Sequence, residues 1–190
     1  MKKNREYRVQ ESRRRVASAA ARAAAEGRAP RVLFVCLGNI CRSPAAQGIA
    51  ENIAGKKGLK DYEFDSAGFY GGHRGDLPDR RMREAAWQRG YLLEHRSRTV
   101  RDSDFDYFDL LIGMDDRNID ALHSAAPTVE DEEKIVRMCD FSTDGFPEMD
   151  CVPDPYYEGP AGFQLVLDML EEGCSELLDE LTISNRDGLK

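Results

Sequence analysis

Cys36 and Arg42 belong to a short segment, CLGNICRS, that places a nucleophilic thiol near a permanently charged guanidinium. Arginine binds oxyanions such as phosphate through two parallel hydrogen bonds, and the backbone N–H groups of a loop that enters a helix converge on one anion site. These positive surroundings favour a thiolate, because cysteines at helix N-termini and beside cations titrate well below the usual value of ~8.5. We therefore expect Cys36 to face a bound phosphoryl group as a thiolate nucleophile.

The elements on either side of this segment would hold it in place. Residues 32–35 are a short apolar run of β-branched, leucine and aromatic side chains, which predicts a buried strand. Ser43 followed by Pro44 is typical of a helix start, with the serine as N-cap and the proline in the first helical position. The thiol therefore lies at the carboxyl end of a strand, where open parallel sheets bind their ligands.

Strands and helices alternate along the rest of the chain. Further strands are expected at residues 62–67, 109–114 and 134–138, and helices at 43–55, 79–90, 116–126 and, as one long amphipathic helix, 163–181. The alternation predicts a single-domain, three-layer α/β fold in which helices flank a four-stranded parallel sheet.

Length and composition narrow the class of protein. A chain of 190 residues favours one domain, and no apolar run approaches the ~18 residues of a membrane-spanning helix. Five cysteines are too few, and odd in number, for a secreted disulfide scaffold. A reactive thiol also suits a reducing compartment, so we expect a cytoplasmic protein.

Charge is distributed unevenly. Ten Lys/Arg and three Glu give residues 1–31 a net charge of +7, so the remainder carries −15 in a chain whose total is −8. An acidic body argues against nucleic acid as a partner.

The alanines and arginines of residues 1–30 favour a basic helical or flexible extension, ended by Gly27 and Pro30. A surface helix, an organellar transit peptide and a partner-docking helix all remain open interpretations of this extension. We expect the folded domain to comprise residues 31–185 and a short tail to comprise 186–190.

The octet CLGNICRS after an apolar strand resembles the signature loop of the low-molecular-weight protein tyrosine phosphatases. A second motif, VPDPYY at residues 152–157, resembles the Asp-Pro-Tyr loop of that family. The resemblance covers roughly residues 31–183. It implies the fold of that family, a phosphotyrosine-containing protein as substrate, no metal or other cofactor, and a monomer or weak dimer.

The resemblance also implies a role for each catalytic residue. Cys36 attacks phosphorus and takes the phosphoryl group as a cysteinyl phosphate, while Arg42 stabilises the charge that develops. Asp154 is the general acid. Expelling a phenol of pKa ~10 as an anion at pH 7 is uphill by roughly 4 kcal/mol, and a proton donated in the transition state removes much of that cost.

Other positions correspond to supporting parts of the family site. The phosphate-binding loop is completed by Leu37, Gly38, Asn39, Ile40, Cys41 and Ser43. Ser66 and His95 would support that loop, and Cys41 would form a reversible disulfide with the nucleophile. The walls of the substrate cleft would be Phe69, Tyr70, Tyr156 and Tyr157.

Three other functions share part of this pattern. Arsenate reductases share the loop, but they need a second cysteine pair, and this chain has no cysteine between Cys41 and Cys139. Protein-arginine phosphatases carry threonine where this chain has Ile40. A non-catalytic phosphate-binding module would be expected to lose the thiol, the arginine or the acid, and all three are present.

Overall fold

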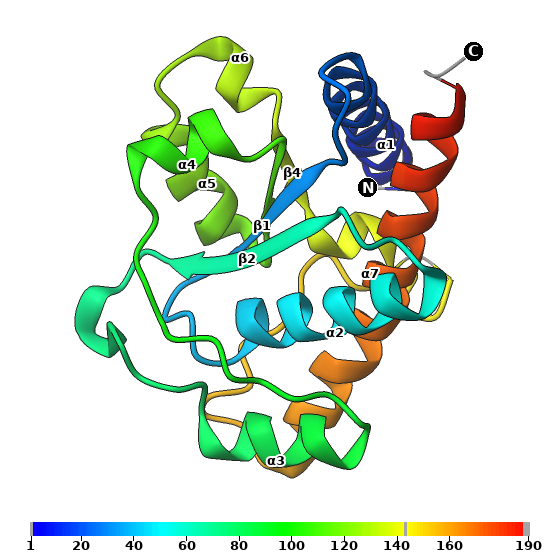
Figure 1. The fold of residues 1–190 in the computed structure, drawn as a ribbon. Helices are drawn as coiled ribbons and strands as arrows, with labels where there is room; N and C mark the ends of the chain where they lie inside the picture. Colours follow the sequence, from blue (N-terminus) through cyan, green and yellow to red (C-terminus); the bar gives the residue numbers. More distant parts are fainter. Residues whose placement is uncertain (1, 143, 188–190) are drawn as a thin grey trace.

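Four parallel strands form the centre of the molecule, in the order β2-β1-β3-β4 (Figure 1). The computed structural model describes residues 2–142 and 144–187, without the side chains of 2–4 and 184–187. The strands are β1 (Arg31–Cys36), β2 (Glu63–Gly68), β3 (Leu110–Gly113) and β4 (Ile135–Arg137). The predicted four-stranded parallel sheet is confirmed.

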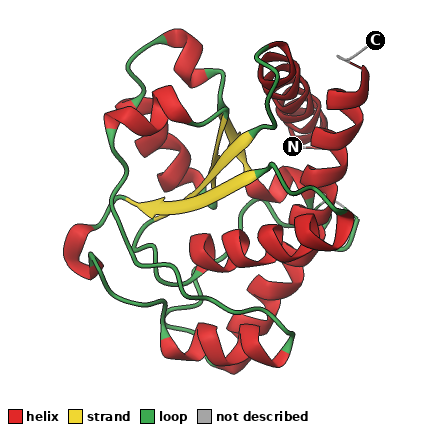
Figure 2. Cartoon of the chain, viewed as in Figure 1, coloured by secondary structure: helices red, strands yellow, loops and turns green. Residues whose placement is uncertain are grey.

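Helices cover both faces of this sheet (Figure 2). The α-helices are α1 (Lys2–Ala25), α2 (Arg42–Lys57), α3 (Arg80–Gln88), α4 (Asp102–Tyr107), α5 (Asp116–Ala125), α6 (Val129–Glu132) and α7 (Pro160–Asp187). Two short 3₁₀ helices are η1 (Gly71–His73) and η2 (Met138–Phe141). Helices α1, α2, α3 and α7 lie on one side of the sheet, and α4, α5 and α6 lie on the other (Figure 1).

The side chains of β1 divide between two cores. Val32 and Phe34 belong to the larger cluster, under α1, α2, α3 and α7, whereas Leu33 and Val35 belong to the smaller cluster with α4 and α5. Successive residues of a strand point to opposite faces, so a strand buried on both sides is apolar throughout. Burial on both faces holds β1 firmly and thereby fixes Cys36 at its carboxyl end.

The main elements agree with the sequence prediction, and the short ones were not anticipated. The strands expected at 109–114 and 134–138 are shorter, at Leu110–Gly113 and Ile135–Arg137. The helices α4 and α6 have six and four residues, too few to show a helical period in the sequence. A helix start at Asp79 is confirmed, because its side chain accepts a hydrogen bond from Arg81 N.

Helix α1 contributes to the core rather than lying on the surface alone. Val16, Ala19, Ala20 and Ala23 are fully buried, and α1 packs along α7 (Figure 1). Of the predicted tail, residues 188–190 lie outside the described part of the chain, and α7 extends to Asp187. None of the described helices is long and apolar enough to span a membrane.

Candidate active site

Cys36 lies at the carboxyl edge of the sheet with its sulfur almost enclosed, only 3% of the residue being exposed. Two polar groups contact the sulfur. Asn39 N–H donates to Sγ at 3.3 Å, and the hydroxyl of Ser43 lies 3.1 Å from it. Asn39 has a φ of 53°, a left-handed conformation that bends the loop back toward the sulfur.

The prediction that Ser43 caps α2 is wrong. The helix begins at Arg42 with Cys41 as N-cap, and no side chain caps it. The Ser43 hydroxyl is instead used inside the loop. It accepts from Asn39 Nδ2 at 3.0 Å and donates to Ala67 O at 3.3 Å, so the serine links the thiol to the loop and to β2.

Arg42 is buried beneath the loop and is held by two carboxylates and a carbonyl. Its Nη1 donates to Asp115 Oδ2 at 2.6 Å and to Val152 O at 3.2 Å, and its Nη2 donates to Asp154 Oδ2 at 3.0 Å. Burial alone would lower the pKa of Arg42, but the facing Cys36 and the two aspartates outweigh it and raise that pKa. The guanidinium is therefore a fixed positive charge at the thiol.

Asp115 is a site residue that sequence reasoning missed. It follows β3 at the same edge of the sheet, and its other oxygen accepts from Asn118 N at 2.9 Å to cap α5. An aspartate after a strand matches no motif by itself. The available signal was its position, since the carboxyl ends of neighbouring parallel strands meet at one edge.

A cleft of about 440 Å³ opens above the thiol. Its described lining consists of Cys36, Leu37, Gly38, Ile40, Cys41, Arg42, Tyr70, His73, Asp154, Tyr156 and Tyr157. Asp154 is partly exposed there and accepts from Tyr156 N at 3.2 Å. The two predicted motifs, more than a hundred residues apart in the chain, thus meet in one cleft.

Aromatic side chains form the walls of this cleft. The rings of Tyr156 and Tyr157 meet edge to face with their centroids 5.0 Å apart, and Tyr70 meets His73 in the same way at 5.6 Å. Phe69, predicted as a further wall, instead packs half-buried on the smaller core cluster. Residues two apart in an extended chain point to the same side, so Phe69 lies on the same face of the sheet as Ala67, which belongs to the smaller cluster.

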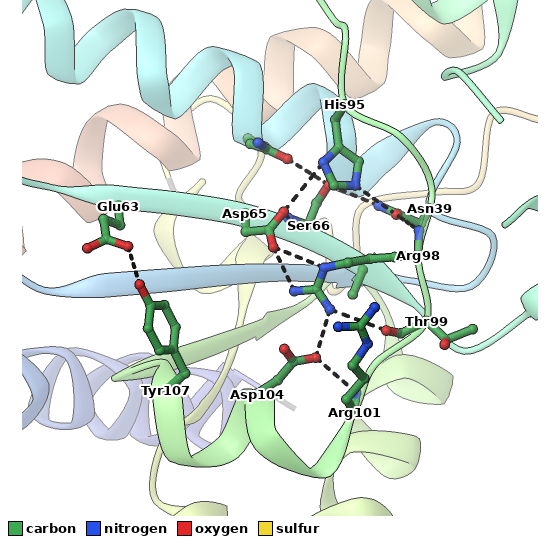
Figure 3. A network of polar contacts seen from close by, with 12 residues as sticks. Asn39, Glu63, Asp65, Ser66, His95, Arg98, Thr99, Arg101, Asp104 and Tyr107 are labelled. Carbon is green, nitrogen blue, oxygen red and sulfur yellow. Dashed lines mark hydrogen bonds and ion pairs between the residues drawn. The ribbon is translucent and has the colours of Figure 1, made fainter. Parts of the chain in front are cut away.

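Asn39 is the centre of a buried polar network beneath the loop (Figure 3). Its Nδ2 donates to Ser66 Oγ at 2.9 Å, while its Oδ1 lies 3.1 Å from His95 Nε2 and accepts from Arg98 N at 2.9 Å. The structure therefore brings Ser66 and His95 to the loop that they were predicted to support. Burial lowers the pKa of His95, and Arg98 adds to this, against the opposing effect of Asp65.

The network continues to α4 through residues that the sequence did not single out. Arg98 pairs with Asp65 at 2.7 Å and with Asp104 at 2.9 Å, as Figure 3 shows. Asp104 in turn accepts from Arg101 N at 2.9 Å at the start of that helix. The supporting residues are thus tied to both β2 and α4.

Cys41 lies in the same loop as a buried thiol. Burial raises its pKa, with further contributions from Asp79 and Cys36, so Cys41 is a neutral thiol at pH 7. All five cysteines are free in the structure, and a reversible disulfide between Cys36 and Cys41 stays a prediction. Within the described ranges, no group of three or more His, Cys, Asp or Glu side chains is placed to hold a metal ion.

Comparison with known proteins decides the family. The model of the low molecular weight phosphotyrosine protein phosphatases matches residues 31–186, most of the chain. The chain belongs to this family. The predictions of the family, of its α/β fold and of a phosphatase enzyme are therefore confirmed.

Individual relatives agree with this assignment. A Synechocystis protein named for the same family is 44% identical over 152 residues, covering 80% of this chain and 96% of the relative. The crystal structure of a protein tyrosine phosphatase from Entamoeba histolytica is 41% identical with a TM-score of 0.78, covering 82% of this chain and 98% of that one. The crystal structure of a Drosophila arginine phosphatase is 32% identical with a TM-score of 0.72, covering 78% of this chain and 95% of that one.

Proposed function

We propose that this enzyme hydrolyses aryl phosphate monoesters, phosphotyrosine in proteins above all, through a cysteinyl-phosphate intermediate. One observation carries the proposal. Cys36, Arg42 and Asp154 line the same cleft, so a nucleophile, a phosphate-binding cation and a proton donor surround one place for a substrate. The other loop residues, with Ser66 and His95, hold the nucleophile in position.

The first step transfers the phosphoryl group to sulfur. Cys36 Sγ attacks phosphorus and forms an S–P bond while the P–O bond to the leaving group breaks. Asp154 donates its proton to the leaving oxygen, which departs as a neutral phenol. The hydrogen bond from Asn39 N–H stabilises the thiolate before attack, and the Ser43 hydroxyl adds a second one when its proton turns from Ala67 O to the sulfur 3.1 Å away.

The second step regenerates the enzyme. Asp154, now a carboxylate, takes a proton from a water molecule that attacks the phosphorus of the cysteinyl phosphate. The S–P bond breaks, Cys36 leaves as a thiolate, and inorganic phosphate is released.

Arg42 has two tasks in this scheme. Asp115 and the Val152 carbonyl hold its guanidinium at the loop, where it binds equatorial oxygens and stabilises their growing charge. Bound phosphate also competes with Asp154 for Nη2 and places negative charge beside that carboxyl, which favours the protonated acid. Substrate binding therefore prepares the acid for its step.

The cleft walls favour an aromatic substrate. Tyr70, Tyr156 and Tyr157 are at least partly exposed around the opening, where they can stack on a phenyl ring. Phosphoarginine is the second candidate, because an arginine phosphatase structure is similar to this chain. Protein-arginine phosphatases carry threonine at the position of Ile40, which lines the cleft. The apolar side chain of Ile40 favours the aryl ester.

The decisive comparison is steady-state turnover of matched phosphotyrosine and phosphoarginine peptides. We expect hydrolysis of the phosphotyrosine peptide, its loss in Cys36→Ser, and much slower release from the phosphoarginine peptide. Cys174→Ser serves as the control for removing a buried thiol away from the cleft, because Cys174 lies in α7 and does not line the cleft. Faster turnover of phosphoarginine would reverse the substrate assignment.

We also propose that the enzyme acts in a reducing compartment such as the cytoplasm, as a monomer or weak dimer. A thiolate nucleophile and five unpaired cysteines are compatible with reducing conditions and would be oxidised outside them.

A further inference from the structure

We propose that α1 positions the general acid, with Arg8 as the positioning residue that holds the segment leading to Asp154. This inference rests on the proposed function, because it concerns the proton that Asp154 donates. Helix α1 lies outside residues 31–186, the part of the chain that matches the family model. The contacts that follow therefore come from an element that the family match does not include.

The first contact is an ion pair whose carboxylate is buried and whose guanidinium is partly exposed. Asp140 in η2 is fully buried, and both of its oxygens are bound by α1. Arg8 Nε donates to Oδ1 at 2.9 Å, and Ser12 Oγ donates to Oδ2 at 2.7 Å. Removing the partners of a buried carboxylate strongly destabilises the folded protein, so the contacts to Asp140 join α1 firmly to η2.

The second contact joins the same arginine to the segment before the acid. Arg8 Nη2 donates to Asp150 Oδ1 at 3.0 Å, and this hydrogen bond lowers the pKa of Asp150. The Asp150 carbonyl accepts from Cys139 Sγ at 2.8 Å and from Arg137 Nη1 at 3.3 Å. Asp150 is therefore fixed in both its side chain and its backbone.

Only three residues separate Asp150 from Asp154, and the backbone between them is also held. Val152 N donates to Met114 O at 2.9 Å, and Val152 O accepts from Arg42 at 3.2 Å. A shift of Asp150 would pass through Val152 to the acid and to the guanidinium. Displacements of about 1 Å at a catalytic group can lower a rate by about 100-fold.

The test distinguishes a loss of proton donation from a general loss of activity. Leaving groups that depart poorly need the acid, whereas good leaving groups do not, so we compare kcat/KM for phenyl phosphate and p-nitrophenyl phosphate. For Arg8→Leu we expect about a 10-fold fall on phenyl phosphate and less than about a 2-fold fall on p-nitrophenyl phosphate, within the 10²–10⁴-fold that a general acid contributes. In an Asp154→Asn background, Arg8→Leu should add no further selectivity.

Arg13→Leu is the matched control. Arg13 is also on α1, but it pairs with Glu180 of α7 at 2.9 Å, so its loss should affect both substrates equally. Asp150→Asn provides a second test. Asp150 is exposed, so this substitution leaves the pair between Arg8 and Asp140 in place, and it should show the same selectivity even if Arg8→Leu does not fold.

Equal losses on the two substrates in Arg8→Leu and Asp150→Asn would overturn this inference. If Asp150→Asn is the only folded variant, its result alone decides. A wild-type enzyme without Cys36-dependent turnover would instead overturn the proposed function itself, so the two failures are distinguishable.

Discussion

At the scale of single residues, Asp154 has the role with the clearest pH signature. It must be protonated to begin the cycle, so we predict that kcat/KM for a phenolic substrate declines toward alkaline pH. Asp154→Asn removes the donor, lowers kcat/KM on phenyl phosphate by about 100-fold and flattens the alkaline limb. A pH–rate profile of both forms tests this, and an unchanged limb in the variant would remove Asp154 from the role.

Asp115 is predicted to act through Arg42. Asn remains a good N-cap for α5 but carries no charge, so Asp115→Asn should keep the stability of the enzyme while loosening the guanidinium. We expect kcat/KM to fall about 10-fold, short of the 10²–10³-fold cost of deleting a donor to the oxyanion. The neighbouring Asp116→Asn, which removes a pair with Arg137, is the control. Equal kinetics in the two variants would contradict this role.

The sequence was most informative where several residues form one contiguous motif. Cys36 and Arg42 share an octet, and Asp154 lies in a second short motif, so all three could be found. Asp115 could not, because its role exists only when β1 and β3 lie side by side. Phe69 was misplaced because the sequence did not show on which face of the sheet the chain leaves β2.

At the scale of elements, the support beneath the loop depends on an uncharged His95. Its pKa is lowered from 6.5, chiefly by burial, so the unfolded chain binds this proton more readily than the folded one. The uncharged His95 therefore contributes to the free energy of unfolding above pH 6.5. This contribution is lost as pH falls from 6.5 toward the pKa of His95 in the folded state.

We predict that the wild type loses more stability than His95→Gln between pH 7.5 and pH 5.5. Denaturant unfolding at several pH values measures the difference between the two proteins. If the wild type kept or increased its lead over His95→Gln in free energy of unfolding at low pH, His95 would be charged in the folded protein.

Strands and long helices were readily predicted from their periodicity, but the cap of α2 was not. Ser43 has the sequence signature of an N-cap, yet its hydroxyl contacts the sulfur of Cys36. A local capping preference worth about 1 kcal/mol gave way to the hydrogen bonds of the loop. Such conflicts between local preference and structure are expected at functional sites.

At the scale of the whole molecule, the basic extension and the acidic body form one structure. Arg14 of α1 pairs with Glu133 at 2.7 Å, and Arg28 pairs with Asp109 at 2.6 Å. The charge asymmetry in the sequence therefore becomes a set of contacts across the molecule. The sequence alone left this open, because a buried alanine stripe cannot be told from ordinary helix-forming alanines.

A pair of adjacent substitutions tests whether α1 belongs to the core. Ala20 is fully buried, whereas Ala21 is exposed. We predict that Ala20→Leu lowers the free energy of unfolding by about 1–3 kcal/mol through overpacking. Ala21→Leu should change it by less than about 0.5 kcal/mol. Thermal or denaturant unfolding measures both, and equal stabilities would mean that α1 does not pack as described.

The covalent intermediate is the central claim of this account, and it can be observed directly. Rapid acid quenching during turnover of a ³²P-labelled aryl phosphate should leave one labelled cysteine, and peptide mapping should place the label on Cys36. The label should be absent from Cys36→Ser. With p-nitrophenyl phosphate, whose good leaving group does not need the acid, it should accumulate in Asp154→Asn because the second step is slowed. Turnover without a labelled Cys36 would contradict the mechanism.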